Sequence, residues 1–114
     1  MSSTKRPWGT YEILSDFVPP CCVKIITVKP NSRLSLQRHW RRTERWRALD
    51  KGLIAEVDGK EIKMSLTKDV FVDVGMVHRI SNPTDEPLRL LELMYGVYDE
   101  SDITRLEDDY GRAQ

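Results

Sequence analysis

Hydrophobic and polar positions alternate along most of this chain in short runs that are separated by turn residues. The runs are rich in β-branched and aromatic residues, which favour strands over helices. They are CVKIITV (22–28), RLSLQRHW (33–40), ERWRAL (44–49), LIAEV (53–57), KEIKMSL (60–66), DVFVDV (69–74), VHRIS (77–81) and LRLLELMYGVY (88–98). Short strands with turn signals at regular spacing predict an all-β sandwich or barrel.

Two segments carry a more specific local prediction. Asp58 and Gly59 lie between two strand patterns, and both residue types tolerate a positive φ, so a tight β-hairpin is predicted there. The alternation stops after residue 98. The tail DESDITRLEDDYGR (99–112) predicts a helical turn or two, with Ser101 or Asp102 as the N-cap.

The segment SLQRHWRRTERW (35–46) fits two different structures. At helical spacing, one face would carry four arginines: Arg38, Arg41, Arg42 and Arg45. At strand spacing, one face would carry a mixed polar set: Ser35, Gln37, His39 and Arg41. The strand interpretation is preferred, because an isolated helix would interrupt a chain otherwise made of short hairpins.

Length and charge restrict the classes of protein that this chain can represent. Its 114 residues suffice for one hydrophobic core, so a single domain over 1–114 is expected. Eighteen basic residues balance eighteen acidic ones, which argues against nucleic acid as a partner. The sequence has no apolar run of membrane-spanning length and no signal-peptide pattern, and its only cysteines, Cys21 and Cys22, are adjacent. A cytoplasmic protein without a membrane partner is therefore expected.

Four potential metal ligands fall at spacings that strands could bring together. A strand that points Gln37 and His39 inward can be followed by one that returns the Glu44 carboxylate beside them. Gly75 permits a tight turn before His78, which would begin a further strand. Two nitrogen and two oxygen donors suit Zn²⁺, Mn²⁺ or Fe²⁺ with positions left for water and substrate.

The same residues carry a resemblance to a known family. The patterns N-x5-Q-x-H-x4-E (31–44) and D-x-G-x2-H-x3-N (73–82) are similar to the two cupin motifs, with Gln37 at the place of the usual first histidine, as in phosphomannose isomerases. The segments RPWGTYEIL (6–14), VKPNSRLSLQRH (28–39) and DITRLEDDYGR (102–112) resemble the type II mannose-6-phosphate isomerase cupin. That domain also forms the C-terminal part of bifunctional isomerase and mannose-1-phosphate guanylyltransferase enzymes.

The resemblance implies a fold, an activity and a cofactor. The fold would be a cupin double-stranded β-helix, a jelly-roll barrel with a short C-terminal helical segment. The activity would be the interconversion of mannose 6-phosphate and fructose 6-phosphate. The cofactor would be a divalent metal ion held by Gln37, His39, Glu44 and His78, with zinc first and manganese, iron, cobalt or nickel as other candidates.

The chain departs from the family where a histidine-rich run is usual. Arg41 and Arg45 replace two of those histidines. Strand alternation predicts that Arg41 points inward, where a guanidinium would oppose a metal or bind a substrate phosphate. Lys24, Arg41 and Arg105 are the candidate catalytic residues, and Arg41, Arg45 and Arg112 are the candidate substrate-binding residues. The apolar segment LELMYGVY (91–98) suggests a barrel mouth less suited to sugar.

Two further functions stay open at this point. The lost histidines are compatible with a divergent cupin that binds a sugar or another small molecule without isomerase activity. The arginine run is compatible with a nucleic-acid-binding module, against which the zero net charge argues. An outward Trp40 and open strand edges predict a homodimer.

Overall fold

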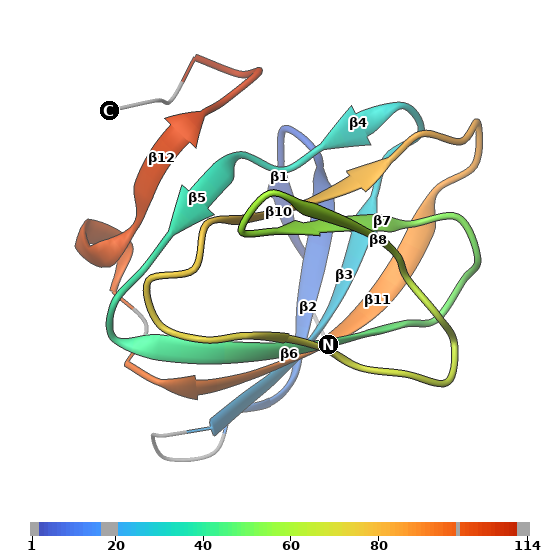
Figure 1. The fold of residues 1–114 in the computed structure, drawn as a ribbon. Helices are drawn as coiled ribbons and strands as arrows, with labels where there is room; N and C mark the ends of the chain where they lie inside the picture. Colours follow the sequence, from blue (N-terminus) through green and yellow to red (C-terminus); the bar gives the residue numbers. More distant parts are fainter. Residues whose placement is uncertain (1–2, 17–20, 98, 112–114) are drawn as a thin grey trace.

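A computed structural model describes residues 3–16, 21–97 and 99–111, which fold into two antiparallel β-sheets. The larger sheet consists, in spatial order, of β1 (Ser3–Arg6), β2 (Gly9–Asp16), β3 (Cys21–Val28), β11 (Leu88–Gly96), β6 (Arg42–Ala48) and β9 (Val70–Val72). The smaller sheet consists of β12 (Thr104–Glu107), β5 (Leu36–Arg38), β10 (His78–Asn82), β7 (Ile54–Val57) and β8 (Lys60–Lys63), with β4 (Ser32–Arg33) also paired to β10. The two sheets face each other across the interior (Figure 1).

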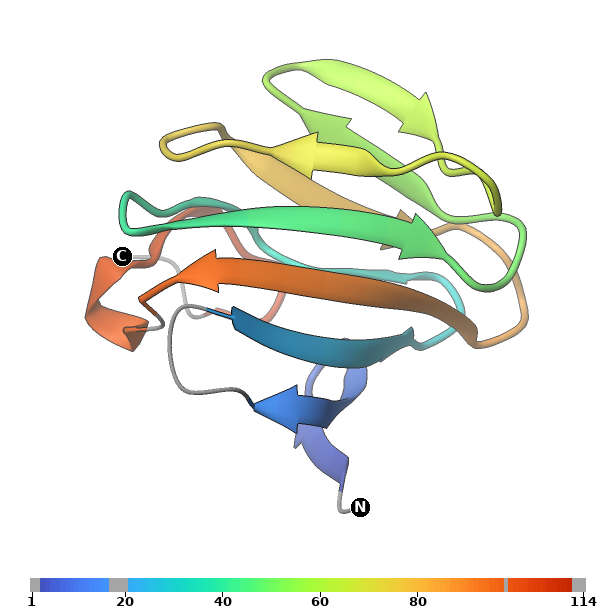
Figure 2. The same cartoon turned by 90° about the horizontal axis from the view of Figure 1, so that it is seen from below.

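Strand alternation explains which side chains fill that interior. In β6 the buried positions are every second residue, and in β11 Leu88, Leu90, Glu92 and Met94 are buried in the same way. The hydrophobic core includes Val28, Trp46 and Leu90 from the larger sheet and Ala55 and Ile80 from the smaller one. Figure 2 shows β11, in orange, between β3 and the green β6, which is the order that the backbone pairing defines.

The expected hairpin at Asp58 and Gly59 is confirmed. The two residues have φ values of 47° and 83°, and β7 pairs with β8 on either side of them. The Asp58 carboxylate also accepts a hydrogen bond from the Val77 N–H at 2.9 Å. The turn is therefore tied to the segment that leads into His78.

The helical interpretation of the arginine-rich segment is wrong. Residues 36–38 and 42–48 are strands, and Trp40 and Arg41 lie in the turn between them. The four arginines consequently do not share a helix face. This removes the structural basis of the nucleic-acid alternative.

The prediction of a helical C-terminal segment is also wrong. Within the described residues 99–111, the only helical element is a 3-10 turn, Glu100–Asp102, and Thr104–Glu107 forms strand β12, which pairs with β5. Ser101 and Asp102 do not cap a helix. The Asp102 carboxylate instead accepts hydrogen bonds from the backbone N–H groups of Trp40 and Arg41, so long-range pairing outweighs the local capping signal. Among the described residues, no helix is long and apolar enough to cross a membrane.

Candidate metal centre and cavity

Three of the four expected ligands come together inside the barrel. His39 follows β5, Glu44 lies in β6, and His78 opens β10. All three are buried, and their ligand atoms lie within 4.8 Å of one another. The Nε2 atom of His39 is 3.4 Å from Oε2 of Glu44, and the Nε2 atom of His78 is 3.6 Å from Oε1 of the same carboxylate.

The loop before β10 orients His78. Nδ1 of His78 lies 2.9 Å from the Met76 carbonyl oxygen, and a proton on Nδ1 can be donated to it. Nε2 then carries the lone pair on the side of Glu44, which is the ring arrangement that metal-binding histidines use. Gly75, at φ 75°, makes the tight turn expected from the sequence, and its N–H donates to the His39 carbonyl at 2.8 Å.

The His39 ring is a buried polar group that suits a metal ligand. Its side chain is almost completely inaccessible, and neither ring nitrogen forms a well-aligned hydrogen bond with the described residues. Buried imidazoles ordinarily have such partners. A divalent cation between His39, Glu44 and His78 would supply one, and two nitrogens with one carboxylate are donors that Zn²⁺ accepts.

Gln37 lies beside this group, directly opposite His78 in the β5–β10 pairing. Its Nε2 donates to Oγ of Ser35 at 3.0 Å, so its amide oxygen is the atom suited to a cation. Gln37 and His78 line one cavity. The four expected ligands therefore lie in one region of the barrel.

Electrostatics hold Glu44 in its charged form. Burial raises the pKa of Glu44, but the close contact of its carboxylate with His39 and the charges of His78 and Arg42 outweigh burial and lower this pKa to about 2. Burial lowers the pKa of His78, which favours its neutral form, despite the opposing charge of Glu44. An ionised carboxylate and a neutral imidazole are the protonation states that metal binding requires.

The centre opens on a cavity of about 90 Å³ between the sheets. Its lining includes the cationic residues Arg6, Lys24, Arg42, Arg79 and Arg105 and the carboxylates Glu44 and Glu92. Arg79 is bound elsewhere, by the Leu34 carbonyl and by Glu107, but the other four still outnumber the carboxylates. The cavity therefore suits an anionic ligand. A ligand larger than a few waters enters only if some of these long side chains change rotamer.

Comparison with known proteins identifies the family. The family model "Mannose-6-phosphate isomerase C-terminal" matches residues 1–108. The chain belongs to this family.

Curated members of the mannose-6-phosphate isomerase C-terminal family are longer than this chain. It is 41% identical over 109 residues to the alginate biosynthesis protein AlgA of Pseudomonas aeruginosa, covering 95% of this chain and 22% of AlgA. It is 43% identical over 111 residues to the xanthan biosynthesis protein XanB of Xanthomonas campestris, and 38% identical over 109 residues to a mannose-1-phosphate guanylyltransferase of Escherichia coli. It spans 23% of each of these two proteins and 95% of itself.

Solved structures show the fold of the family member. The capsular polysaccharide assembling protein CapF of Staphylococcus aureus superposes with a TM-score of 0.82 at 17% identity, over 93% of this chain and 31% of CapF. A cupin-2 domain, Rru_A2000 of Rhodospirillum rubrum, superposes with a TM-score of 0.73 at 19% identity, over 89% of this chain and 76% of that one. The expected all-β cupin fold is confirmed.

In this family member, two of the expected phosphate-binding arginines lie outside the cavity. Arg41 is exposed and pairs with Asp99 at 3.5 Å, so the expectation that it points inward is wrong. The turn at residues 40 and 41 interrupts the alternation, and Arg42 takes the inward position instead. Arg45 lies on the outer face of β6, 3.9 Å from Asp69. Arg112 lies outside the described residues.

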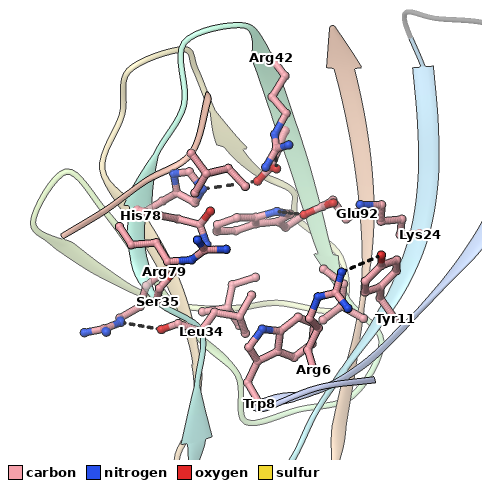
Figure 3. A pocket seen from close by; sticks show the side chains of 17 residues that line it. Arg6, Trp8, Tyr11, Lys24, Leu34, Ser35, Arg42, His78, Arg79 and Glu92 are labelled. Atoms are coloured by element: carbon pink, nitrogen blue, oxygen red, sulfur yellow. Dashed lines mark hydrogen bonds and ion pairs between the residues drawn. The ribbon is translucent and has the colours of Figure 1, made fainter. Parts of the chain in front are cut away.

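Lys24 and Arg105 do line the cavity, as Figure 3 shows for Lys24. Lys24 projects inward from β3, and its Nζ lies 4.8 Å from the centre of the Tyr11 ring. Arg105 comes from β12, the strand that replaces the expected helical tail. The pairing of β12 with β5 sets Arg105 opposite Gln37.

Four charged residues of the cavity were not predicted from the sequence: Arg6, Arg42, Arg79 and Glu92. Arg42 is buried with Nε 3.2 Å from Oε2 of Glu44, and Glu92 is buried with Oε2 accepting a hydrogen bond from Nε1 of Trp46 at 3.2 Å. The expectation of an apolar barrel mouth from residues 91–98 is wrong, because Tyr95 and Val97 face solvent while Glu92 faces inward. Alternation along Leu88, Leu90 and Glu92 was the signal that could have identified Glu92.

Burial dominates the protonation of Glu92. Removal from water and the neighbouring charge of Glu44 raise the pKa of Glu92 to about 7, although Lys24, Arg42 and the Trp46 indole act in the opposite direction. The cavity thus contains two carboxylates with very different proton affinities.

Proposed function

We propose that this chain is a metal-dependent sugar-phosphate isomerase domain that interconverts mannose 6-phosphate and fructose 6-phosphate. The observation that supports this most directly is the His39, Glu44 and His78 group at the wall of a cavity with an excess of cationic side chains. A metal site beside a cationic cavity suits a substrate that carries both hydroxyl or carbonyl oxygens and a phosphate. Membership of the mannose-6-phosphate isomerase C-terminal family points to the same substrate class.

The proposed metal ligands are Gln37, His39, Glu44 and His78, with zinc as the first candidate and manganese, iron, cobalt or nickel as others. When bound, a divalent ion would polarise the substrate oxygens on the reacting carbons. The phosphate would be held by cavity cations, for which Arg105 and Lys24 are the proposed residues. Arg42, beside Glu44, keeps that carboxylate ionised.

The direct test is isomerisation of mannose 6-phosphate by the purified chain loaded in turn with each candidate metal. We expect one divalent ion per chain and turnover with at least one metal. The His78→Ala variant should lose both, and unphosphorylated mannose should be a poor substrate. A metal-loaded chain that turns over no mannose 6-phosphate would contradict the proposal.

One observation favours a second function, a cupin that binds sugar phosphate without isomerising it. Arg42 already lies within ion-pair distance of the Glu44 carboxylate, and a fixed cation at that place opposes a divalent ion. On this alternative the chain binds mannose 6-phosphate without a metal. Calorimetric titration of metal-free chain with mannose 6-phosphate distinguishes the two, since the isomerase needs the metal for turnover.

We also propose that residues 1–114 form a single cytoplasmic domain that assembles as a homodimer. One cluster of buried hydrophobic residues joins both sheets, and both cysteines of the chain are free thiols, as is usual in a reducing compartment. Strand β9 is an edge of the larger sheet with Phe71 exposed on it, and Trp40 is 58% exposed in the turn before β6. Open edges and exposed aromatic residues are commonly covered by a second subunit.

A further inference from the structure

Glu92 is a buried carboxylate of the cavity whose function none of the comparisons assigns. It lies in the middle of β11 and faces the cavity that Glu44 and His78 also line. In the larger sheet it is paired with Lys24 of β3 on one side and with Trp46 of β6 on the other. Figure 3 shows Glu92 and Lys24 on one side of the cavity and His78 on the opposite side.

The charged and titratable groups that act on Glu92 come from both neighbouring strands. Lys24 belongs to β3, while Arg42 and Glu44 belong to β6. The Trp46 indole holds one of the Glu92 oxygens by the hydrogen bond described above. Glu92 is therefore a positioned carboxylate beside the metal centre and separate from the four proposed ligands.

Glu44 and Glu92 are suited to different tasks. Glu44 contacts two histidines and Arg42, so it stays ionised and is available to a cation. Glu92 is buried in the cavity wall, and burial raises its pKa to about 7 in the metal-free chain, so it is the carboxyl group of the cavity that can take up and release a proton near neutral pH. Two carboxyl groups whose environments separate their proton affinities are the usual pattern of a site with one fixed charge and one acid-base group.

We propose that Glu92 is the acid-base residue that carries the proton between the two reacting carbons of the sugar phosphate. This inference rests on the proposed isomerase function. The ionised carboxylate removes the proton from C2 of the open-chain aldose, and the C–H electron pair forms a C1–C2 double bond while the C1 carbonyl electrons move to O1. The proton on O2 passes to O1 as the C2 carbonyl forms, and Glu92 returns its proton to C1. No oxidant or reductant is consumed.

A purely structural role for Glu92 makes different predictions, so the test uses variants that separate the two roles. Glu92→Gln keeps the shape and can still accept the indole hydrogen bond, but it cannot act as a base. Glu61→Gln, on the exposed strand β8, is the matched control. Both are prepared as the metal-loaded full chain, and metal content is measured first.

The readouts are steady-state isomerisation and exchange of the C2 hydrogen of mannose 6-phosphate in deuterated water, followed by NMR. For Glu92→Gln we expect kcat to fall by about 10³-fold, with exchange lost in parallel. KM should stay within about threefold and the metal content should not change. Glu61→Gln should match the wild type within about twofold in both readouts.

The pH profile provides a readout that a structural residue would not change. In the wild type, kcat/KM should rise with pH along an acid limb as Glu92 ionises, and this limb should be absent from the residual activity of Glu92→Gln. In Trp46→Phe, which removes the indole N–H, the limb should move to higher pH, because that hydrogen bond favours the ionised carboxylate. An unchanged limb in both variants would overturn the assignment.

The outcomes distinguish this inference from the proposed function. If the wild type shows no turnover with any of the candidate metals, both the proposed function and the role of Glu92 are overturned. An active wild type together with a Glu92→Gln variant that keeps more than about a tenth of its kcat overturns only the role of Glu92. If Glu92→Gln does not fold, the Trp46→Phe profile and a Glu92→Asp variant, which should retain the acid limb at a lower rate, decide the question.

Discussion

Nε of Arg42 lies 3.2 Å from Oε2 of Glu44, and both side chains are buried in the barrel. This cation contributes to the low pKa of Glu44, together with the two histidines. A buried charge that loses its partner is strongly destabilising, whereas a buried charge that keeps one is tolerated. Arg42 is therefore expected to stabilise the metal-free barrel by compensating the Glu44 carboxylate.

Replacing this arginine should destabilise the metal-free protein more than the metal-loaded one. We expect Arg42→Met to lower the free energy of unfolding by about 3 kcal/mol without metal, because Glu44 is left with less compensation. Saturating zinc should reduce that loss by at least about half, since the metal supplies the missing positive charge. Urea denaturation with and without zinc measures both values. The control is Arg45→Met, on the exposed outer face, which should change the free energy of unfolding by no more than about 0.5 kcal/mol. If Arg42→Met lowers the free energy of unfolding equally with and without zinc, Arg42 does not compensate the Glu44 charge.

Glu92 should leave a distinct mark on the pH dependence of stability in the metal-free protein. Its pKa is raised from 4.5 to about 7 on folding, so the folded state binds the proton more tightly and the resulting stability is lost as pH rises between these values. The loss should total about 3 kcal/mol by pH 8. Glu92→Gln lacks this pH-dependent contribution, so its free energy of unfolding relative to the wild type should increase as pH rises between these values.

Comparing the two proteins at each pH is necessary because other groups titrate nearby. The lowered pKa of His78 has the opposite sign, since its contribution is present above 6.5 and is lost as pH falls. The lowered pKa of Glu44 acts only at more acidic pH, between 4.5 and about 2. Both are common to the wild type and Glu92→Gln, so denaturation midpoints of the pair from pH 4 to pH 8 isolate Glu92. Parallel curves for the two proteins would exclude a raised pKa for this residue.

The sequence was a good guide where strand alternation runs without interruption. Alternation over 42–48 and 88–96 accounts for the inward side chains of β6 and β11, and the Asp58–Gly59 turn is a local property of two residues. The spacing of His39, Glu44 and His78 was enough to predict that their donors meet, because it matches the ligand spacing of the two cupin motifs that the sequence resembles.

Prediction from the sequence failed where tertiary contacts decide the outcome. Counting by two from His39 leads to Arg41, but the turn at Trp40 and Arg41 breaks the count and sends Arg42 inward. Asp102 carries a helix-capping signal, yet its carboxylate binds the backbone of that same turn and the following residues pair with β5. The raised pKa of Glu92 depends on its burial and on the charge of Glu44, a residue that lies far from it in the chain. None of these three features can be predicted from a short stretch of the sequence.

Metal binding should depend on each histidine of the centre. We expect His78→Ala and His39→Ala each to lower zinc affinity by more than about 100-fold, because each removes one metal ligand and one of the two histidines that contact Glu44. Gln37→Ala should have a smaller effect, since an amide oxygen is a weaker donor than imidazole. Competition with a chromogenic chelator measures the affinities. A wild-type chain that stays free of metal in solutions of all five candidate ions would contradict the site.

The homodimer should be disrupted by a charge on the exposed edge. We expect the wild type to have the mass of a dimer by light scattering at tens of micromolar. Phe71→Glu should shift it towards the monomer, because Phe71 is an exposed aromatic residue on edge strand β9. Leu66→Glu, at another exposed apolar position, is the control and should leave the mass unchanged. A monomeric wild type would exclude the assembly.

Substrate binding should respond to the arginines inside the barrel and not to those outside it. Arg105 lines the cavity opposite Gln37, whereas Arg41 is 59% exposed and pairs with Asp99. Loss of a charge-assisted contact to phosphate should raise the KM of Arg105→Ala for mannose 6-phosphate by at least about tenfold. Arg41→Ala should keep the wild-type KM within about twofold, because its guanidinium does not line the cavity.

The same measurement shows whether the family's missing histidines matter for turnover. Restoring histidine at both outer positions, in an Arg41→His and Arg45→His double variant, should leave kcat within about twofold of the wild type, since neither side chain faces the cavity. A steady-state assay of metal-loaded wild type, Arg105→Ala, Arg41→Ala and the double variant tests the four proteins together. A double variant that is active beside an inactive wild type would mean that positions 41 and 45 act on the substrate after all. Arg41→Ala with a raised KM and Arg105→Ala without one would reverse the assignment of the phosphate-binding arginine.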